Sequence, residues 1–261
     1  VVVADPSATP PGWQNPRYQA WNPANGVNTQ VTGIVNLWFR NAAGTVIGGC
    51  TGSLLSNGRI LTAAHCVSTG ANSIIPASFT ARFFNQATGS WVDVNGSNIW
   101  VHPSYTGQVI HSHDVAVLGL STPAPAFAQT YSLFSGPAST FRGQQTFVGG
   151  FGRVGTGVTG DNTSSNQFTD AATLRFGYNT FESSGRTGGL FANQLSADPM
   201  GFGGVLLSDI DPAGGSTTSF LCGALGGGTN AAFCNSGYGL MEVGLGRGDS
   251  GGAAFLANTW E

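Results

Sequence analysis

GDSGG, at residues 248–252, is the stretch that decides the fold of this chain. A serine between an aspartate and paired glycines lies on a turn tight enough to expose its hydroxyl. The turn also aligns the backbone N–H groups of Gly248 and Ser250 beside that hydroxyl, as a serine nucleophile and its oxyanion hole require. The motif therefore predicts Ser250 as a nucleophile, but a match this short needs support from elsewhere in the chain.

Two upstream motifs supply that support. LTAAHC at residues 61–66 contains His65, and HDVAVL at residues 113–118 contains Asp114. A serine hydroxyl is a weak nucleophile and needs a base, and histidine exchanges protons near neutral pH. An aspartate can hold the imidazole in the tautomer that leaves one nitrogen free, and it stabilises the imidazolium. The chain order predicts a triad of His65, Asp114 and Ser250 that transfers an acyl group to serine and then to water.

Together these motifs resemble the chymotrypsin/trypsin-like family of serine proteases. Residues 49–55 and 61–66 are similar to the family's first barrel around its histidine. Residues 100–105 are similar to the strand before its aspartate, and residues 149–152 resemble the start of its second barrel. The resemblance implies an all-β fold of two antiparallel Greek-key β-barrels. It also implies a secreted endopeptidase acting on polypeptides, and we expect a bacterial member.

Short apolar runs between turn residues predict β-strands along most of the chain. We expect a hairpin around the turn at residues 41–44, a single turn at 63–67 that presents His65, and further short strands at 59–62, 78–84, 97–101, 115–120, 146–150 and 173–178. We divide the chain into an extended N-terminal arm, an N-terminal barrel, and a C-terminal barrel lacking its last strands, at residues 1–28, 29–125 and 126–261.

The composition limits the classes of partner. Only 8% of the residues are charged, the formal net charge is −3, and all nine basic residues are arginines. Because these arginines form no basic cluster, we expect no nucleic acid and no anionic membrane surface as a partner. The sequence also has no apolar stretch near the roughly 20 residues that span a bilayer, which argues against a membrane protein.

Four cysteines allow three disulfide pairings. The family resemblance pairs Cys50 with Cys66 across the first barrel, which leaves Cys222 and Cys234 to close a glycine-rich loop. Disulfides persist in oxidising compartments, so this pairing implies a secreted, extracellular protein. The alternative is a set of free thiols or a metal site, but the cysteines lack the CxxC spacing of such a site.

Asp249 lies behind the predicted oxyanion turn, where a buried carboxylate needs a partner. In the family that this sequence resembles, the partner of the equivalent aspartate is often a new N-terminal ammonium released by cleavage. In this chain Val1 is further from His65 than the family's terminus, and the usual Ile/Val-Val-Gly-Gly start is missing. Three candidates therefore stay open for a structural ion pair with Asp249: the Val1 ammonium, Arg142 and Arg153.

Primary specificity depends on the residues just before the nucleophile. Trypsin-like members place an aspartate where this chain has Gly244, so the predicted pocket of Gly244, Leu245 and Arg247 carries no acidic group at its floor. This predicts a preference for uncharged or apolar residues and argues against Lys or Arg. The family also continues beyond the position of Glu261. We therefore expect a complementary C-terminal segment of the same precursor as a partner.

Two other functions stay open. A catalytically inactive homologue would use the same fold as a binding module, and Glu261 at the end of the sequence suggests a glutamate-selective endopeptidase that cleaves itself. Serine chemistry requires no cofactor. His111 with His113, and Asp209 with Asp211, alternate in the way that ligands for a metal or for structural Ca²⁺ do, but loop positions explain them better. We therefore expect no metal.

Overall fold

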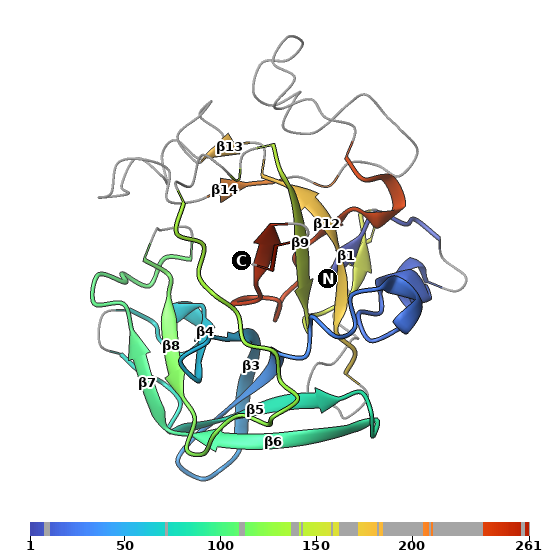
Figure 1. The fold of residues 1–261 in the computed structure, drawn as a ribbon. Helices are drawn as coiled ribbons and strands as arrows, with labels where there is room; N and C mark the ends of the chain where they lie inside the picture. Colours follow the sequence, from blue (N-terminus) through green and yellow to red (C-terminus); the bar gives the residue numbers. More distant parts are fainter. Residues whose placement is uncertain are drawn as a thin grey trace.

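The computed structural model of the chain (Figure 1) describes residues 1–7, 11–70, 73–109, 113–136, 141, 143–157, 159–161, 172–181, 183–184, 206–208, 210, 237–256 and 259–260. Its regular elements are β-strands and short 3₁₀-helices, and no α-helix occurs within these ranges. In the same ranges, no helix has the length and apolar character needed to cross a membrane. The predicted all-β class is confirmed.

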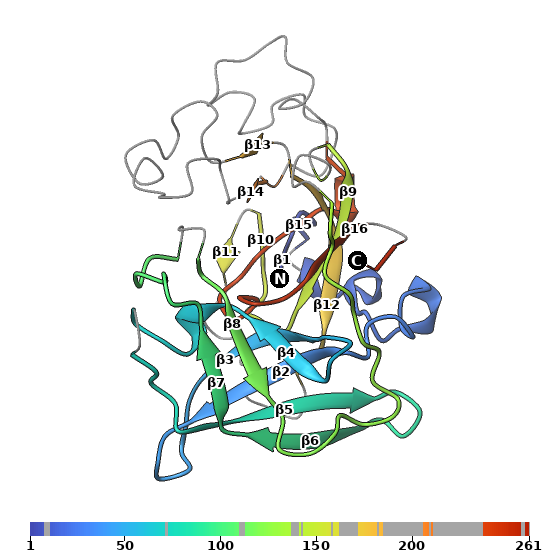
Figure 2. The same ribbon diagram turned by 60° about the vertical axis from the view of Figure 1, so that its left-hand side comes forward.

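The first half of the chain forms one antiparallel sheet of seven strands. Their spatial order is β6 (Ser90–Gly96), β5 (Ser78–Asn85), β2 (Ile34–Arg40), β3 (Val46–Leu54), β4 (Arg59–Thr62), β8 (Ala116–Gly119) and β7 (Asn98–Val101). Figures 1 and 2 show that the sheet curls. Its apolar core includes Leu37, Phe79, Phe83 and Leu118, none of which is exposed to solvent.

The hairpin predicted from the sequence is confirmed as β2 and β3, which pair antiparallel. Asn41 begins the turn, and its side-chain oxygen accepts hydrogen bonds from the backbone N–H groups of Ala43 and Thr45, both at 3.0 Å. Gly44 has φ +79°, a conformation that glycine adopts without a steric penalty. The turn therefore forms because its side chains and its glycine satisfy the backbone locally.

The second half consists of smaller sheets. In one, β9 (Gln145–Gly150) pairs on one side with β12 (Arg175–Thr180) and on the other with β16 (Ala254–Leu256). A second sheet has the order β11 (Gly160–Asp161), β10 (Gly155–Thr156), β1 (Val2–Val3) and β15 (Val243–Gly244). A third pairs β13 (Ser183–Ser184) with β14 (Leu206–Leu207). Aromatic rings fill the core beside β9, with Phe147 stacked on Phe176 at 5.1 Å between ring centroids.

The N-terminal segment differs from the extended arm that we expected. β1 lies in a sheet of the second half, parallel to β10 and antiparallel to β15. It is followed by the 3₁₀-helices η1 (Gly12–Gln14), η2 (Pro16–Tyr18) and η3 (Pro23–Asn25). An asparagine cap and a proline in the first turn start both η2 and η3. These local caps need no hydrophobic periodicity, which is why the sequence pattern did not reveal them.

The short strands expected from the sequence are confirmed as β4, β5, β7, β8, β9 and β12. The turn expected at residues 63–67 is the 3₁₀-helix η4 (Ala64–Cys66). β6 is not among the expected strands, although residues 92–95 alternate between apolar and polar. The strands of two residues are also missing from the expectation, because segments this short carry no readable periodicity.

Candidate active site

His65 and Asp114 meet at one end of the first sheet. His65 lies on η4, directly after β4, and Asp114 lies two residues before β8, which pairs with β4. The backbone N–H of His65 donates to Asp114 Oδ1 at 2.8 Å, and His65 Nδ1 lies 2.6 Å from Asp114 Oδ2. With its carboxylate partner on Nδ1, the imidazole keeps Nε2 for proton transfer. The pairing of β4 with β8 is thus what unites two residues that are far apart in sequence.

Tyr105 contributes to the environment of this pair. Its ring is 1% exposed. Burial, and then the charge of the nearby Asp114 carboxylate, raise the pKa of Tyr105 above its ordinary value. The phenol is therefore neutral wherever a serine nucleophile with a histidine base would work, and it adds no charge next to Asp114.

The turn that carries Ser250 packs against the strands that lead to His65. The backbone N–H of Thr51, on β3, donates to the carbonyl of Ser250 at 3.0 Å, and Cys66 Sγ lies 3.8 Å from the same carbonyl oxygen. Gly251 has φ +78°, and a Cβ there would lie 2.1 Å from Thr62 Oγ1. Only glycine therefore permits this approach. It brings the serine turn to the residues on either side of His65, although no hydrogen bond joins the described side chains of Ser250 and His65.

Two backbone N–H groups of the turn are available to a substrate. Gly248 has φ +93°, and its carbonyl is turned toward Thr51, whose Oγ1 donates to it at 2.9 Å. The N–H groups of Gly248 and Ser250 donate to no acceptor among the residues that the structure describes. Two free N–H groups on one tight turn are the donors that an oxyanion hole requires.

Asp249 forms a buried ion pair with the amino group of Val1. The nitrogen of Val1 lies 2.7 Å from Asp249 Oδ2, and neither group is exposed to solvent. Backbone N–H groups of Gly152 and Gly246 donate to the two carboxylate oxygens, each at 2.8 Å. Arg153 takes part through its carbonyl, which accepts from the Val1 amino group at 2.7 Å.

Of the three candidate partners for Asp249, the structure thus pairs the carboxylate with Val1. Arg142 lies outside the described residues. The guanidinium of Arg153 instead faces Asp161, at 3.9 Å from Nη1 to Oδ2. Removing one member of such a buried pair leaves an uncompensated charge and costs about 3–5 kcal/mol. The amino group of Val1 therefore fixes the residue next to Ser250.

The disulfide between Cys50 and Cys66 is confirmed, with a Cα–Cα distance of 6.2 Å. Their sulfurs and a ring nitrogen of His65 lie within 4.8 Å of one another, but in a disulfide the sulfurs offer no thiolate to a metal. Cys222 and Cys234 lie outside the described residues.

Only one of the four residues weighed as metal ligands, His113, lies within the described residues. His111, Asp209 and Asp211 lie outside the described residues. The ring of His113 packs against that of His102, with 4.6 Å between the centroids. His102 Nδ1 accepts a hydrogen bond from the backbone N–H of Ser104 at 3.2 Å. Nδ1 of His102 therefore already has a hydrogen-bond donor within the protein.

The residues predicted to form the specificity pocket lie close together but face different surroundings. Gly244 is part of β15, and a Cβ there would lie 2.4 Å from Ile210 Cδ1. Leu245 is 64% exposed, and the side chain of Arg247 is 80% exposed. Arg247 Nε lies 3.6 Å from Asp161 Oδ2. Asp161 is not among the site residues predicted from the sequence, because no motif connects β11 with the serine turn.

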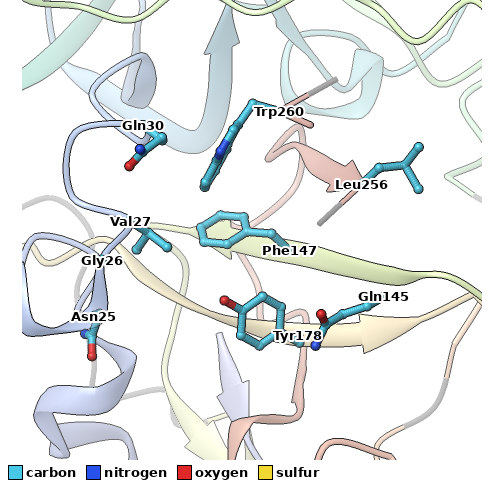
Figure 3. A pocket seen from close by; sticks show the side chains of 9 residues that line it. All are labelled: Asn25, Gly26, Val27, Gln30, Gln145, Phe147, Tyr178, Leu256 and Trp260. Carbon is cyan, nitrogen blue, oxygen red and sulfur yellow. The ribbon is translucent and has the colours of Figure 1, made fainter. Parts of the chain in front are cut away.

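Two cavities lined by described residues lie apart from His65 and Asp114. The larger, of about 370 Å³, is shown in Figure 3 and is lined by Asn25, Gly26, Val27, Gln30, Gln145, Phe147, Tyr178, Leu256 and Trp260. The rings of Trp260, Phe147 and Tyr178 lie one above another in this view. The smaller, of about 220 Å³, is mainly apolar and reaches Gly251 and Gly252, directly after Ser250. Neither cavity is lined by Gly244, Leu245 or Arg247.

Comparison with protein families matches residues 29–199 of this chain to the trypsin family. The matched range contains His65 and Asp114 and ends before Ser250. Among curated proteins, the chain is similar to the serine protease snk of Drosophila melanogaster, with 34% identity over 73 residues. That alignment spans 28% of this chain and 17% of the relative. This relative is from an animal and gives no support to a bacterial origin.

Among solved structures, the chain is similar to HL collagenase, with 21% identity, a TM-score of 0.48, and coverage of 87% of this chain and 77% of that chain. It is also similar to neuropsin, a serine protease expressed in the limbic system of mouse brain, with 18% identity, a TM-score of 0.48, and coverage of 88% and 79% respectively. A structure of GrC matches with 19% identity and a TM-score of 0.43, over 58% of this chain and 61% of that chain.

Proposed function

The chain belongs to the trypsin family, and on that premise we propose that it is a secreted serine endopeptidase with His65, Asp114 and Ser250 as its catalytic residues. The observation that carries the proposal is the contact of 2.6 Å between His65 Nδ1 and Asp114 Oδ2. Support also comes from the adjoining serine turn, where the N–H groups of Gly248 and Ser250 have no acceptor in the described part of the chain and would form the oxyanion hole of the same machinery. The Cys50–Cys66 disulfide supports an oxidising, extracellular setting.

In this proposal Ser250 Oγ attacks the carbonyl carbon of the scissile peptide bond while His65 Nε2 takes its proton. The tetrahedral oxyanion receives hydrogen bonds from the N–H groups of Gly248 and Ser250. His65 then returns the proton to the leaving amine, and an acyl-enzyme remains on Ser250. Water repeats the sequence and releases the acid. Asp114 stabilises the imidazolium in both halves of the reaction.

The amino group of Val1 has a structural role in this proposal. By neutralising Asp249 it holds the peptide units of Gly248 and Ser250, on either side of Asp249, in the conformation that frees their N–H groups. Among the described residues, Val1 is the cation in direct contact with Asp249, and the guanidinium of Arg175 interacts with the same carboxylate only from a longer distance. A protein without a free amino group at Val1 would therefore leave the carboxylate buried without its contacting cation.

For primary specificity we propose an uncharged or apolar residue on the acyl side of the scissile bond. Gly244 supports this, because no acidic side chain is present there to attract Lys or Arg. The glutamate-selective alternative is supported by Arg247, which directly precedes the oxyanion turn. Its side chain is 80% exposed. A peptide library with all residues at that position separates the two preferences.

A strand from a complementary segment remains our proposal for a partner. Within the described residues, β16 is hydrogen-bonded to β9 on one side and to no strand on the other. Cavities lined by Phe255 and by Leu256 lie beside it. An added strand would satisfy the open backbone groups of this edge.

Labelling with a fluorophosphonate probe tests the endopeptidase proposal against the inactive-homologue alternative. We expect one label per molecule on Ser250, loss of the label in Ser250→Ala, and loss of at least about two orders of magnitude in labelling rate in His65→Ala. Absence of labelling in a folded protein with the disulfide intact would favour the binding module.

A further inference from the structure

We propose that Arg247 and Arg153 recognise an acidic side chain of the substrate close to the scissile bond. The inference rests on the proposed endopeptidase function and names its substrate class. It starts from a feature that the triad does not use: two arginines beside the serine turn that share one carboxylate among the described residues.

The backbone places both arginines next to the oxyanion donors. Arg247 directly precedes Gly248, and the N–H of Arg153 donates to the carbonyl of Arg247 at 2.8 Å. The neighbours Gly152 and Gly246 are both bonded to the Asp249 carboxylate. These two segments are therefore fixed side by side next to Ser250, and the guanidinium groups of Arg153 and Arg247 both lie near Asp161.

The charges of this cluster do not balance. Asp161 Oδ2 lies 3.6 Å from Arg247 Nε and 3.9 Å from Arg153 Nη1, both longer than a hydrogen bond. Asp161 Oδ1 is buried and has no hydrogen-bond partner in the described part of the chain. Among the described residues, Asp161 is the carboxylate that faces these two guanidinium groups, so this part of the structure carries one more positive charge than negative. Asp249 does not compensate for it, because the Val1 ammonium already neutralises that carboxylate.

The excess charge is accessible to a substrate. The side chain of Arg247 is 80% exposed, so its guanidinium can present two N–H groups to a carboxylate in the bidentate geometry that arginine favours. An arginine side chain reaches about two residue spacings of an extended peptide, each ~3.3 Å. A carboxylate within about two residues of the scissile bond is therefore in range.

This recognition differs from that of the primary pocket. In the proposed primary specificity, the lack of an acidic group at Gly244 favours an uncharged residue, whereas Arg247 and Arg153 are proposed to act on a neighbouring side chain. Glutamate and aspartate fit the cluster by charge, because the carboxylate of either residue can accept hydrogen bonds from a guanidinium. A basic residue at the same position would add to the existing positive charge.

Paired peptides that differ only by Glu or Gln at each position near the scissile bond test the proposal. At the most responsive position we expect kcat/KM for the Glu peptide to exceed that for the Gln peptide by about three- to tenfold. Arg247→Gln should bring the ratio close to one, Arg247→Glu should invert it, and Arg153→Gln should lower it in part. Asp161→Asn should raise it, because the competing carboxylate is gone.

Arg59→Gln is the matched control, because Arg59 belongs to β4 and stacks on Trp100 at 4.9 Å, away from the serine turn. This variant should keep the wild-type ratio. Binding of the same peptides to Ser250→Ala provides a readout that needs no hydrolysis, so a failed endopeptidase function and a failed acid preference give different results. Equal binding and equal cleavage of Glu and Gln peptides at every position would overturn the proposal.

Discussion

The two halves of the molecule hold their parts of the candidate triad in different ways. His65 and Asp114 are placed by β4 and β8, neighbours in one sheet of seven strands. Ser250 lies on a turn whose shape depends on Val1, at the opposite end of the sequence. The proposed base and its carboxylate thus depend on their own sheet, whereas the turn of the proposed nucleophile also depends on a distant amino group. We therefore expect that the proposed activity can be lost without loss of the first half's fold.

Replacing Asp249 should give the largest difference between the two halves. Asp249→Asn leaves the Val1 ammonium buried without a counter-charge, and we expect a loss of about 3–5 kcal/mol, confined to the second half. Fluorophosphonate labelling should fall by at least about two orders of magnitude, while amides of β2 and β5 keep their protection from hydrogen exchange. The matched control is Asp93→Asn, which removes a carboxylate that is 43% exposed and pairs with Arg82. Because its partner Arg82 is only 7% exposed, this variant should also destabilise the protein, but in the first half, and labelling of Ser250 should fall much less than in Asp249→Asn.

Removing the disulfide acts on the first half. The bridge joins residues 16 positions apart, and closing a loop of that length stabilises a protein by about 3 kcal/mol. We expect Cys50→Ala combined with Cys66→Ala to lower the free energy of unfolding by that amount in urea titrations of the oxidised protein. A loss much smaller than 1 kcal/mol would show that the first sheet does not depend on this link.

Thr51 connects the two halves, and its replacement sharpens the comparison. Its Oγ1 donates to the carbonyl of Gly248 at 2.9 Å and accepts from the N–H of Phe151 at 3.0 Å. Thr51→Val keeps the shape but leaves both groups unsatisfied, which should cost about 1–3 kcal/mol. We expect a decrease in kcat larger than any change in KM, whereas Thr51→Ser should retain most activity. An unchanged kcat in Thr51→Val would show that the hydroxyl of Thr51 is not needed to hold the serine turn.

The smallest expected effect concerns alkaline pH. Tyr18 is fully buried, and its hydroxyl donates to the carbonyl of Leu240. Burial raises its pKa from 10.0 to about 12. Below pH 10 the neutral phenol stabilises the second half. As the pH rises from 10 toward 12, the unfolded chain loses this proton first, so stability falls.

Tyr18→Phe removes that titration and one hydrogen bond, at a cost of about 1 kcal/mol near neutral pH. We expect its unfolding free energy to fall less steeply than that of the wild type between pH 10 and 12. Thermal denaturation across this range measures both slopes. Identical slopes would mean that Tyr18 does not contribute to the alkaline limit.

The sequence predicts the first half better than the second, for a physical reason. In the first half, short apolar runs form strands that pair with neighbours close in the chain, as in the hairpin of β2 and β3. The triad residues are also predicted, because each lies in a recognisable local motif. β1 and β15 are only two residues long, and their pairing joins the ends of the chain. No local pattern records such a contact.

The ion pair of Asp249 illustrates the same limit. The need for a buried partner follows from the sequence, and Val1 is among the candidates that it offers, but the choice between Val1 and an arginine depends on tertiary folding. Asp161 shows the opposite case. Nothing near it in the sequence links it to Arg247, and only the structure brings the two within 3.6 Å.

The most direct test of the central claim, that the free amino group of Val1 shapes the serine turn, is the labelling rate of Ser250 with a blocked terminus. A protein carrying one extra glycine before Val1 is compared with the same protein after removal of that glycine. We expect labelling to fall by at least about 100-fold in the extended form and to recover on removal. An unchanged rate in the extended form would contradict the account.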